Sequence, residues 1–421
     1  MTAFPDKTLE VLIAGVPAGY LHQHASGGLS FTYRTDYRGT PLSLSMPVAN
    51  TTYGDKKVRP YLFGLLPDDR ATRRALGNSL DVSGDNPFAL LSVMGLDCPG
   101  AVQVCASSGV KQAVKRNQKY VPITPEEIEG RLQHLSTLRS PSWQAPSEHW
   151  SLGGQQAKMA LARFDDAWFQ CNGAAATTHI VKPGIPHLMH QALNEHFCLR
   201  LANACGVNAS HSEFVLFGNV PAIVVERYDR IVEEPFRVTR LHQEDLCQAL
   251  GVLPENKYAS EGGPSARDVA ALLARHPRAQ ENKIEFAAQL FFNYLIGAPD
   301  AHAKNYSILL GSTGTPTLAP LYDVASGLPY KPERGTWRSA MSIGGQNEFG
   351  RVRGSNVRRF AEAASIEPGL AVDLMGNLAK AVLREMPGVA REVSSIEGGP
   401  DLAQRLQEEI APLCERTLAM L

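Results

Sequence analysis

This 421-residue sequence lacks the features of a membrane or secreted protein. No run approaches the roughly 20 apolar residues of a transmembrane helix, and the polar amino terminus with its short apolar run does not suggest a signal peptide. The seven cysteines include no Cys-x-x-Cys pair, and their odd number argues against a disulfide framework or a zinc site. These absences predict a cytoplasmic protein with reduced cysteines and no membrane contact.

An excess of charge of either sign is also missing. Lys and Arg number 41 against 42 Asp and Glu, which leaves a formal net charge of −1. Overall charge therefore implies neither bulk polyanion binding nor membrane attraction, although a local basic face is still possible. Hydrophobic residues at 44% and charged residues at 20% are ordinary for a globular protein, and the length allows two or three domains.

The pattern along the chain changes in a way that predicts its organisation. Alternation over residues 8–20 and 41–48 predicts strands, whereas amphipathic helical patterns dominate after residue 240. Between them, Thr124 and Pro125 look like the start of a helix, and a loose polar stretch follows. We predict an N-terminal α/β subdomain over 1–125, a linker over 126–150, a strand-rich small lobe over 151–240 and a helical lobe over 241–421.

An Asp-x4-Asn pair followed by a later Asp carries the strongest chemical signal. An apolar run leads into Asp300, Asn305 follows five residues later, and Asp323 comes after a strand-like segment and a turn. Protein kinases use this order to face one carboxylate toward the substrate hydroxyl and two oxygens toward magnesium. The alternative is ordinary turn chemistry, because Asp and Asn bend the backbone locally. His302 and Lys304 within the loop favour phosphoryl transfer.

Residues 151–158, Ser-Leu-Gly-Gly-Gln-Gln-Ala-Lys, lie between strand-like flanks. Gly153 and Gly154 let the backbone approach a bound group closely, and successive amides in such a turn can cradle phosphate oxygens. The segment is not a Walker A loop, because the required glycine spacing and the terminal Lys-Ser/Thr are missing. An ordinary glycine hairpin is the alternative.

Two later strands fit the same chemistry. Lys182 ends a strand, where a kinase needs a lysine for the α- and β-phosphates, although a lysine in such a place usually faces solvent. The apolar strand from Ala222 to Glu226 runs into Arg227 and Tyr228. It suits the connection between two lobes, where backbone groups pair with adenine, and it equally suits a buried strand with a charged exit.

With these segments in order, the sequence resembles the HipA family, the serine/threonine kinase toxins of bacterial toxin–antitoxin pairs. The resemblance covers nearly the whole length, and it implies an α+β fold. That fold would be bilobal and protein-kinase-like, with an additional N-terminal α/β subdomain and a mainly helical C-terminal lobe. The matching segments are PLSLSMPV, LFGLLPD, NPFALLSVMG with GAVQV, SLGGQQAKMAL, THIVK, VERYDR, QEDLCQALG with KYASEGGP, IGAPDAHAKNYS and LYDVAS.

The resemblance also implies roles for individual residues. Asp300 would be the catalytic base, and Asn305 and Asp323 would hold Mg²⁺. Ser151 would be the serine whose autophosphorylation switches the kinase off. ATP would be bound by Gly153, Gly154, Gln155, Gln156, Lys158, Lys182, Glu226, Arg227, Tyr228, His302, Lys304 and Tyr322. One departure is that the family's phosphate loop usually has a single glycine between small apolar residues.

The implied activity is that of an ATP- and Mg²⁺-dependent protein serine/threonine kinase, a growth-arresting toxin linked to persistence. Its target would be an aminoacyl-tRNA synthetase, with the glutamyl enzyme as the leading candidate. A DNA-binding HipB-like antitoxin would inhibit the kinase. Operator DNA would be reached through the antitoxin. A basic cluster could touch DNA phosphates directly, or it is a solvated helix face; its members are Arg351, Arg353, Arg358 and Arg359.

Two other functions are compatible with the sequence. A non-catalytic kinase-like shell would bind antitoxin and operator DNA, but such a shell has no chemical reason to keep Lys182 together with the Asp300, Asn305 and Asp323 set. A small-molecule kinase would share the same loop chemistry, and the N-terminal subdomain argues weakly against it.

Overall fold

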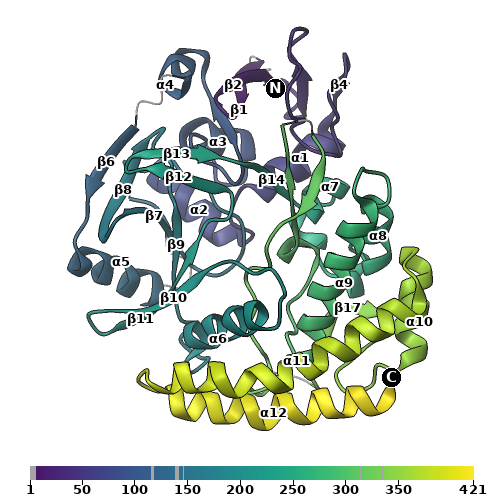
Figure 1. Cartoon of the computed structure of the whole chain (residues 1–421). Helices are drawn as coiled ribbons and strands as arrows, with labels where there is room; N and C mark the ends of the chain where they lie inside the picture. The colour runs from purple at the N-terminus through teal and green to yellow at the C-terminus, as the bar shows by residue number, and fades with distance from the viewer. Residues whose placement is uncertain (1–5, 115–117, 138–141, 146, 313, 333–334) are drawn as a thin grey trace.

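The computed structural model describes residues 6–114, 118–137, 142–145, 147–312, 314–332 and 335–421. Its elements form an N-terminal unit, a middle unit and a C-terminal unit, which meet at a common centre (Figure 1). Helices and sheets are both well represented, as the predicted α+β class requires.

The N-terminal unit is an antiparallel sheet in the order β4-β3-β2-β1-β5 with helices packed against it. Leu9, Val11 and Ile13 of the first strand are buried together with residues of the first and third helices. The third helix begins with Asn86 accepting a hydrogen bond from Phe88 N, a typical N-cap. The elements are β1 (Lys7–Ile13), β2 (Val16–Gln23), β3 (Leu29–Tyr33), β4 (Thr52–Tyr53), α1 (Asp55–Gly64), α2 (Arg70–Ser79), α3 (Pro87–Met94), β5 (Val102–Cys105), the 3₁₀ turn Ser107–Gly109 and α4 (Val110–Val114).

The strand predicted over residues 41–48 is not formed. The segment instead makes a turn with an isolated bridge between Ser43 and Met46. Leu44 N donates to Glu244 Oε1 at 2.7 Å, and the hydroxyl of Ser45 donates to Gln248 O at 3.2 Å. The alternation that suggested a strand comes from a segment that buries apolar side chains while its polar groups bind the C-terminal unit.

The middle unit is a sheet in the order β10-β11-β9-β7-β8-β6, with α5 on one face and α6 on the other. Ala222 and Val224 of β11 pack in the cluster of α5, whereas Ile223 and Val225 pack in the cluster of α6, so the strand is buried on both faces. The elements are β6 (Gln118–Pro122), α5 (Pro125–Thr137), β7 (Met159–Phe164), β8 (Ala167–Gly173), β9 (His179–Pro183), α6 (Gln191–Ala204), β10 (Ser212–Phe217), β11 (Val220–Glu226), β12 (Arg230–Glu234) and β13 (Arg237–Arg240).

The first half of the predicted linker, residues 126–137, belongs to helix α5 of the middle unit. The α5 helix buries Ile128, Leu132 and Leu135 against the middle sheet, because its apolar residues recur on one face. The β6 strand, placed by prediction in the N-terminal subdomain, pairs with β8 in this sheet. Residues 138–141 and 146 of the predicted linker lie outside the described residues.

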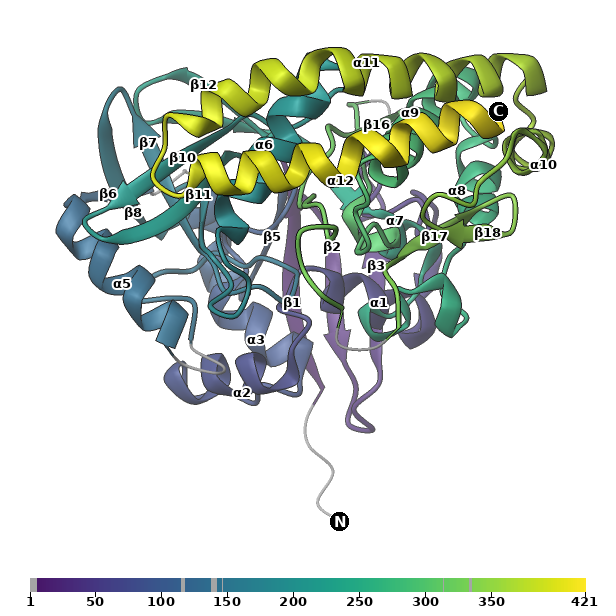
Figure 2. The same ribbon diagram turned by 90° about the horizontal axis from the view of Figure 1, so that it is seen from below.

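The C-terminal unit is mainly helical. Two long helices, α11 and α12, run antiparallel and side by side along one edge of the molecule (Figures 1 and 2), and α11 also packs on α6 and α9. The elements are β14 (His242–Asp245), α7 (Leu246–Leu250), η2 (Pro254–Asn256), η3 (Ala259–Glu261), α8 (Ala266–Leu273), α9 (Ala279–Leu295), η4 (Ala303–Asn305), β15 (Ser307–Leu310), β16 (Pro316–Leu318), β17 (Arg338–Ile343), β18 (Gln346–Glu348), α10 (Gly354–Ala364), α11 (Pro368–Ser394) and α12 (Gly399–Met420).

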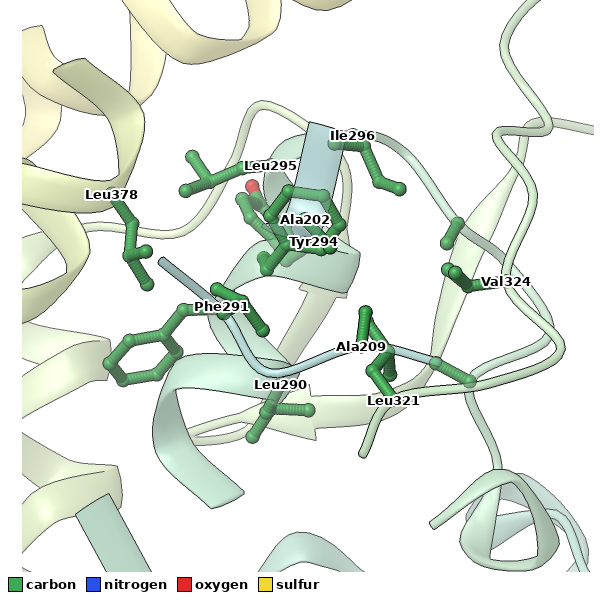
Figure 3. Close-up of a cluster of buried hydrophobic side chains, with 14 of the residues drawn as sticks. Ala202, Ala209, Leu290, Phe291, Tyr294, Leu295, Ile296, Leu321, Val324 and Leu378 are labelled. Atoms are coloured by element: carbon green, nitrogen blue, oxygen red, sulfur yellow. The ribbon is translucent and has the colours of Figure 1, made fainter. Parts of the chain in front are cut away.

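The end of α9 anchors the loop that carries Asp300. Phe291, Tyr294 and Ile296 are fully buried in the main apolar cluster, beside Leu321 and Val324 from the segment around Asp323 (Figure 3). Asp300 and Asp323 therefore both lie next to residues of this one apolar cluster.

A buried ionic cluster joins the N-terminal unit to the end of β11. Asp97 Oδ1 lies 3.0 Å from Arg230 Nη2 and 2.9 Å from Arg240 Nη2, and Asp97 Oδ2 lies 3.5 Å from Arg227 Nη1. Asp229 pairs with Arg227 at 2.8 Å. Charges this deeply buried need partners on every side, so the cluster specifies how these two units dock. Among the helices of the described residues, none is both long and apolar enough to cross a membrane.

Candidate active site

A cavity of about 1330 Å³ lies where the three units meet. The glycine loop, the end of β9, the segment after β11 and the loop containing Asp300 all line it. The sequence positions predicted to bind ATP or metal or to act as base lie around this one space: Gly153, Gly154, Gln155, Gln156, Lys158, Lys182, Glu226, Arg227, Tyr228, Asp300, His302, Lys304, Asn305, Tyr322 and Asp323. Their individual roles stay predictions.

Lys182 stands between two carboxylates. Its strand, β9, is hydrogen-bonded between β7 and β11, which fixes the direction of the side chain. Lys182 Nζ lies 2.8 Å from Glu195 Oε1 on α6 and 2.6 Å from Asp323 Oδ1. Burial disfavours the charge on Lys182, but Asp323 and Glu195 more than offset this and raise its pKa. The lysine is therefore a fixed cation at the edge of the cavity.

Asp300 is open to the cavity, with 61% of its side chain exposed. Tyr258 donates a hydrogen bond to Asp300 Oδ1 at 2.6 Å, and His302 Nε2 lies 3.8 Å from the same oxygen. Desolvation by the cavity walls raises the pKa of Asp300, and the bond from Tyr258 lowers it in part. Burial lowers the pKa of His302 to about 3, so its ring is neutral. Asp300 thus keeps a second carboxylate oxygen for a substrate hydroxyl.

Asn305 and Asp323 offer hard oxygen ligands on one side of a small recess that Asp300 also lines. Asn305 Nδ2 donates to Asp300 O at 2.7 Å, which leaves the amide oxygen for a cation. Asp323 has φ of 54°, a conformation rare outside glycine that is often kept at functional sites. Burial opposes its charge, but Lys182 and Lys158 more than offset this and lower its pKa.

This donor set fits magnesium. Within the described residues, no group of three or more His, Cys, Asp or Glu residues could hold a metal. Mg²⁺, however, is usually held by one or two carboxylates together with waters and substrate phosphates. The carboxylate of Asp323 and the amide oxygen of Asn305, both lining the large cavity, are consistent with this mode of Mg²⁺ binding.

The glycine loop is shaped by contacts that exclude side chains. A Cβ on Gly153 would lie 2.7 Å from Gly64 O and 2.8 Å from Lys304 Nζ, and Gly154 has φ of 98°. Lys158 Nζ donates to Gly153 O at 2.8 Å. Burial lowers the pKa of Lys158 to about 8. Close packing on the backbone therefore favours glycine at position 153, and the positive φ favours glycine at position 154.

Two tyrosines also line the cavity. The rings of Tyr228 and Tyr322 are 5.6 Å apart, and Tyr322 donates to Lys304 O at 2.8 Å. Arg227 lines the cavity as well, but its guanidinium group is 2% exposed and is held by Asp229 and Asp97. Arg227 would therefore contact a nucleotide through its backbone and not through its side chain.

Three other predicted positions are engaged with the protein itself. The Lys304 ammonium lies 3.0 Å from Asp68 Oδ1, so it is neutralised rather than free for phosphate. Gln156 Nε2 donates to Pro183 O at 2.9 Å and braces the wall of the cavity. Ser151 is fully buried, with its amide bonded to Asp97 O at 2.9 Å and its hydroxyl near Cys98.

Four residues of the site were not predicted: Asp68, Glu195, Lys257 and Tyr258. The kinase pattern gave a signal for Glu195, because a strand lysine in a kinase pairs with a glutamate of the following helix. Asp68 and Tyr258 lie in segments with no catalytic signature, and only their position in the fold brings them to the cavity.

The predicted basic cluster lies away from these groups, at the start of α10. All four arginines, at 351, 353, 358 and 359, are exposed, and Arg351 Nε lies 3.4 Å from Glu348 Oε2. Their contact with DNA stays a prediction.

Comparison with known proteins identifies the family of this chain. Residues 150–388 match the family model of the HipA-like C-terminal domain, and residues 9–105 match that of the HipA N-terminal domain. The chain belongs to the HipA family. It is 34% identical over 93% of both chains to the putative kinase Y4mE of Sinorhizobium fredii. It is 29% identical to the serine/threonine-protein kinase toxin HipA of Shewanella oneidensis, over 99% of this chain and 98% of that one.

The fold agrees with this assignment. The HipA chain in the Shewanella oneidensis structure of HipA, HipB and operator DNA superposes with a TM-score of 0.85, at 27% identity over 98% of both chains. The predicted α+β, kinase-like fold class is thereby confirmed, and so is the prediction that this HipA-family protein is a protein kinase. The family is that of serine/threonine kinase toxins.

Proposed function

We propose that this HipA-family kinase transfers phosphate from ATP, with Mg²⁺, to a serine or threonine of a protein target and thereby arrests growth. The observation that carries the proposal is the placement of Lys182 between Glu195 and Asp323, with the Asp300 carboxylate open to the same cavity. A catalytic lysine, its helix glutamate, a metal-binding aspartate and a base are the parts that phosphoryl transfer needs.

Each group has a defined task in this reaction. The free oxygen of Asp300 accepts the proton of the substrate hydroxyl as the hydroxyl oxygen attacks the γ-phosphorus of ATP, and ADP leaves. Lys182 attracts the phosphate oxygens, and Asn305 and Asp323 would hold magnesium, which neutralises phosphate charge when bound. The neutral ring of His302 lies beside the base and adds no competing charge.

Ser151 is the proposed regulatory site. Its side chain is fully buried behind the glycine loop. A phosphoserine carries close to two negative charges, which cannot be buried without cationic partners. Autophosphorylation would therefore force the loop out of the phosphate end of the cavity and switch the enzyme off.

The proposed biological setting follows the family. A HipB-like antitoxin would hold the kinase inactive and link it to operator DNA, as the complex of the Shewanella oneidensis relative suggests. The exposed arginines at 351, 353, 358 and 359 are candidates for direct phosphate contacts. We place the kinase in the cytoplasm, with an aminoacyl-tRNA synthetase, first of all the glutamyl enzyme, as target and persistence as the consequence.

The experiment is intact-mass measurement of phosphatase-treated protein after incubation with ATP and Mg²⁺. The wild type should gain a phosphate that maps to Ser151, and Asp300→Asn should gain none. EDTA should also abolish the gain. An unmodified wild type would overturn the proposal and favour a kinase-like shell that only binds partners.

A further inference from the structure

A carboxylate of the N-terminal unit lines the cavity beside the glycine loop. Asp68 follows α1 and has a side chain only 6% exposed. Its Oδ2 lies 2.9 Å from Lys257 Nζ, and its Oδ1 lies 3.0 Å from Lys304 Nζ. Lys304 belongs to the loop of the catalytic base, and Lys257 stands next to Tyr258, which bonds that base. One carboxylate thus ties the N-terminal unit to two segments that surround the reacting groups.

The backbone beside this carboxylate holds the glycine loop. The amide of Asp68 donates to Gly154 O at 2.9 Å, and the residue before it forms a parallel β-bridge with Gly154. Gly153 is pressed so closely on Gly64 O and Lys304 Nζ that no Cβ would fit. The loop that would cover phosphate is therefore packed between the N-terminal unit and the catalytic segment.

The charges at this junction are buried and poorly screened. Asp68 and Asp245 face Lys257 and Lys304, with Asp245 Oδ2 3.6 Å from Lys304 Nζ, and each of the four side chains is at most 9% exposed. Buried charges interact strongly because little water lies between them. Without the Asp68 carboxylate, two lysine charges would remain directly under the glycine loop with one acid between them.

We propose that Asp68 is a positioning residue for phosphoryl transfer. Its carboxylate holds Lys257 and Lys304, its amide holds Gly154, and the N-terminal unit thereby keeps the glycine loop closed over the phosphates. The inference rests on the proposed function of the cavity, but the hold on the loop is a property of the protein without nucleotide.

The first measurement is therefore hydrogen exchange of the nucleotide-free protein. Asp68→Asn keeps the size of the side chain and removes its charge. We expect amide exchange in the 152–158 loop to accelerate by about tenfold or more, as loss of charge-assisted hydrogen bonds implies. Asp85→Asn is the matched control, because Asp85 belongs to the same unit but pairs with Arg70 and Arg74 on the surface. The control should exchange as the wild type does.

Kinetics provide the second measurement. Asp68→Asn should raise KM for ATP about tenfold, a loss of one charge-assisted contact, with a smaller change in kcat. A purely structural defect would instead reduce the amount of active enzyme and leave KM unchanged. The double variant Asp68→Asn/Lys304→Gln should accelerate exchange by less than the two single variants combined, because the contact between Asp68 and Lys304 is lost in both.

If Asp68→Asn does not fold, Lys257→Met provides a second test. This change removes one of the two lysine partners of Asp68 and alters a residue outside the loop that contains Asp300. It should accelerate exchange in the same loop to a lesser degree. Unchanged exchange in the glycine loop, or acceleration spread evenly over the N-terminal unit, would overturn the inference. Absence of activity in the wild type would overturn the proposed function alone, since exchange is read without ATP.

Discussion

Tyr258 is the group that fixes the candidate base. Its hydroxyl donates to Asp300 Oδ1 at 2.6 Å, and its ring meets the edge of His302 with centroids 4.9 Å apart. A carboxylate with one oxygen held in this way presents the other oxygen in a defined direction, which is how positioning contributes to rate. The same bond stabilises the ionised form of Asp300 and works against the desolvation that raises its pKa.

Tyr258→Phe should lower kcat by roughly tenfold, the value of a strong hydrogen bond to a charged group, with KM for ATP little changed. Removal of the donor also raises the pKa of Asp300 further. Because the base works when ionised, the acid limb of the pH–kcat profile should move to higher pH. The profile of phosphate incorporation measures both effects. A profile that moves to lower pH, or does not move, would contradict this role.

Among the elements, α6 and β9 act as a pair. The β9 strand aims Lys182 into the cavity from a sheet that is buried on both faces, and α6 packs on that sheet with Glu195 facing the lysine. The two charges are 6% and 1% exposed, so their positions follow from the packing of the helix on the strand.

Glu195→Gln should reduce kcat/KM by about ten- to a hundredfold, as expected for loss of one buried charge-assisted bond. Lys182 would then pair with Asp323 alone, and this would pull the Asp323 carboxylate away from its proposed position as a metal ligand. The fold should survive, because glutamine has the same shape and Lys182 keeps one carboxylate partner. Kinetics at saturating and limiting ATP, beside a thermal melt, measure the effect; full activity with a neutral side chain would contradict it.

The docking of the N-terminal unit involves the whole molecule. The cluster around Asp97 contains three arginines and Asp229, all within the interface to the end of β11. Burial opposes the charge of Asp97, but the arginines more than offset this and lower its pKa. The backbone of the same residue holds Ser151, so the cluster also supports the regulatory position.

Asp97→Asn should lower the free energy of unfolding by about 3–5 kcal/mol, because it leaves three buried arginines with the Asp229 carboxylate in place of two carboxylates. Urea denaturation measures the loss. Asp85→Asn, which removes a carboxylate from exposed ion pairs in the same unit, should remain close to wild type. Equal stability of the two variants would show that the cluster is not needed for docking.

A second interface contact predicts pH dependence. Glu244 binds Leu44 N, and burial raises its pKa to about 8. The folded state therefore binds a proton that the unfolded chain has already lost above about pH 4.5. The stability that this proton provides is complete below that pH and is lost as pH rises toward 8.

Glu244→Gln mimics the protonated form. The variant should gain stability relative to wild type as pH rises from about 5 to 8, by at most about 1.4 kcal/mol per pH unit. The difference between the two unfolding curves isolates Glu244 from the buried histidines, whose pKa values are lowered and which act in the opposite direction. A constant difference across this range would contradict the assignment.

The groups of the site that are close in sequence could be proposed from local spacing together with the residues around them, and the structure places them around one cavity. Asp300 and Asn305 share a loop, and the adjacent glycines share another. Local patterns also gave α9 and the long C-terminal helices. Patterns misled where the partner of a segment was distant. Residues 41–48 alternate like a strand but contact another unit. The start of α5 was predicted at Thr124 and Pro125, but the helix was assigned to a linker although its apolar residues pack on the middle sheet.

Charge pairing depended on the folded chain. Lys182 meets Asp323 across 141 positions, and Asp68 meets Lys257 across 189. The position of a charged residue in the sequence does not indicate its partner, because the attraction between two charges becomes strong only when folding brings them together away from water. The sequence therefore supplied the candidate base, the candidate metal ligands and the glycine loop, whereas folding determined which lysines are neutralised and how the N-terminal unit contacts the glycine loop.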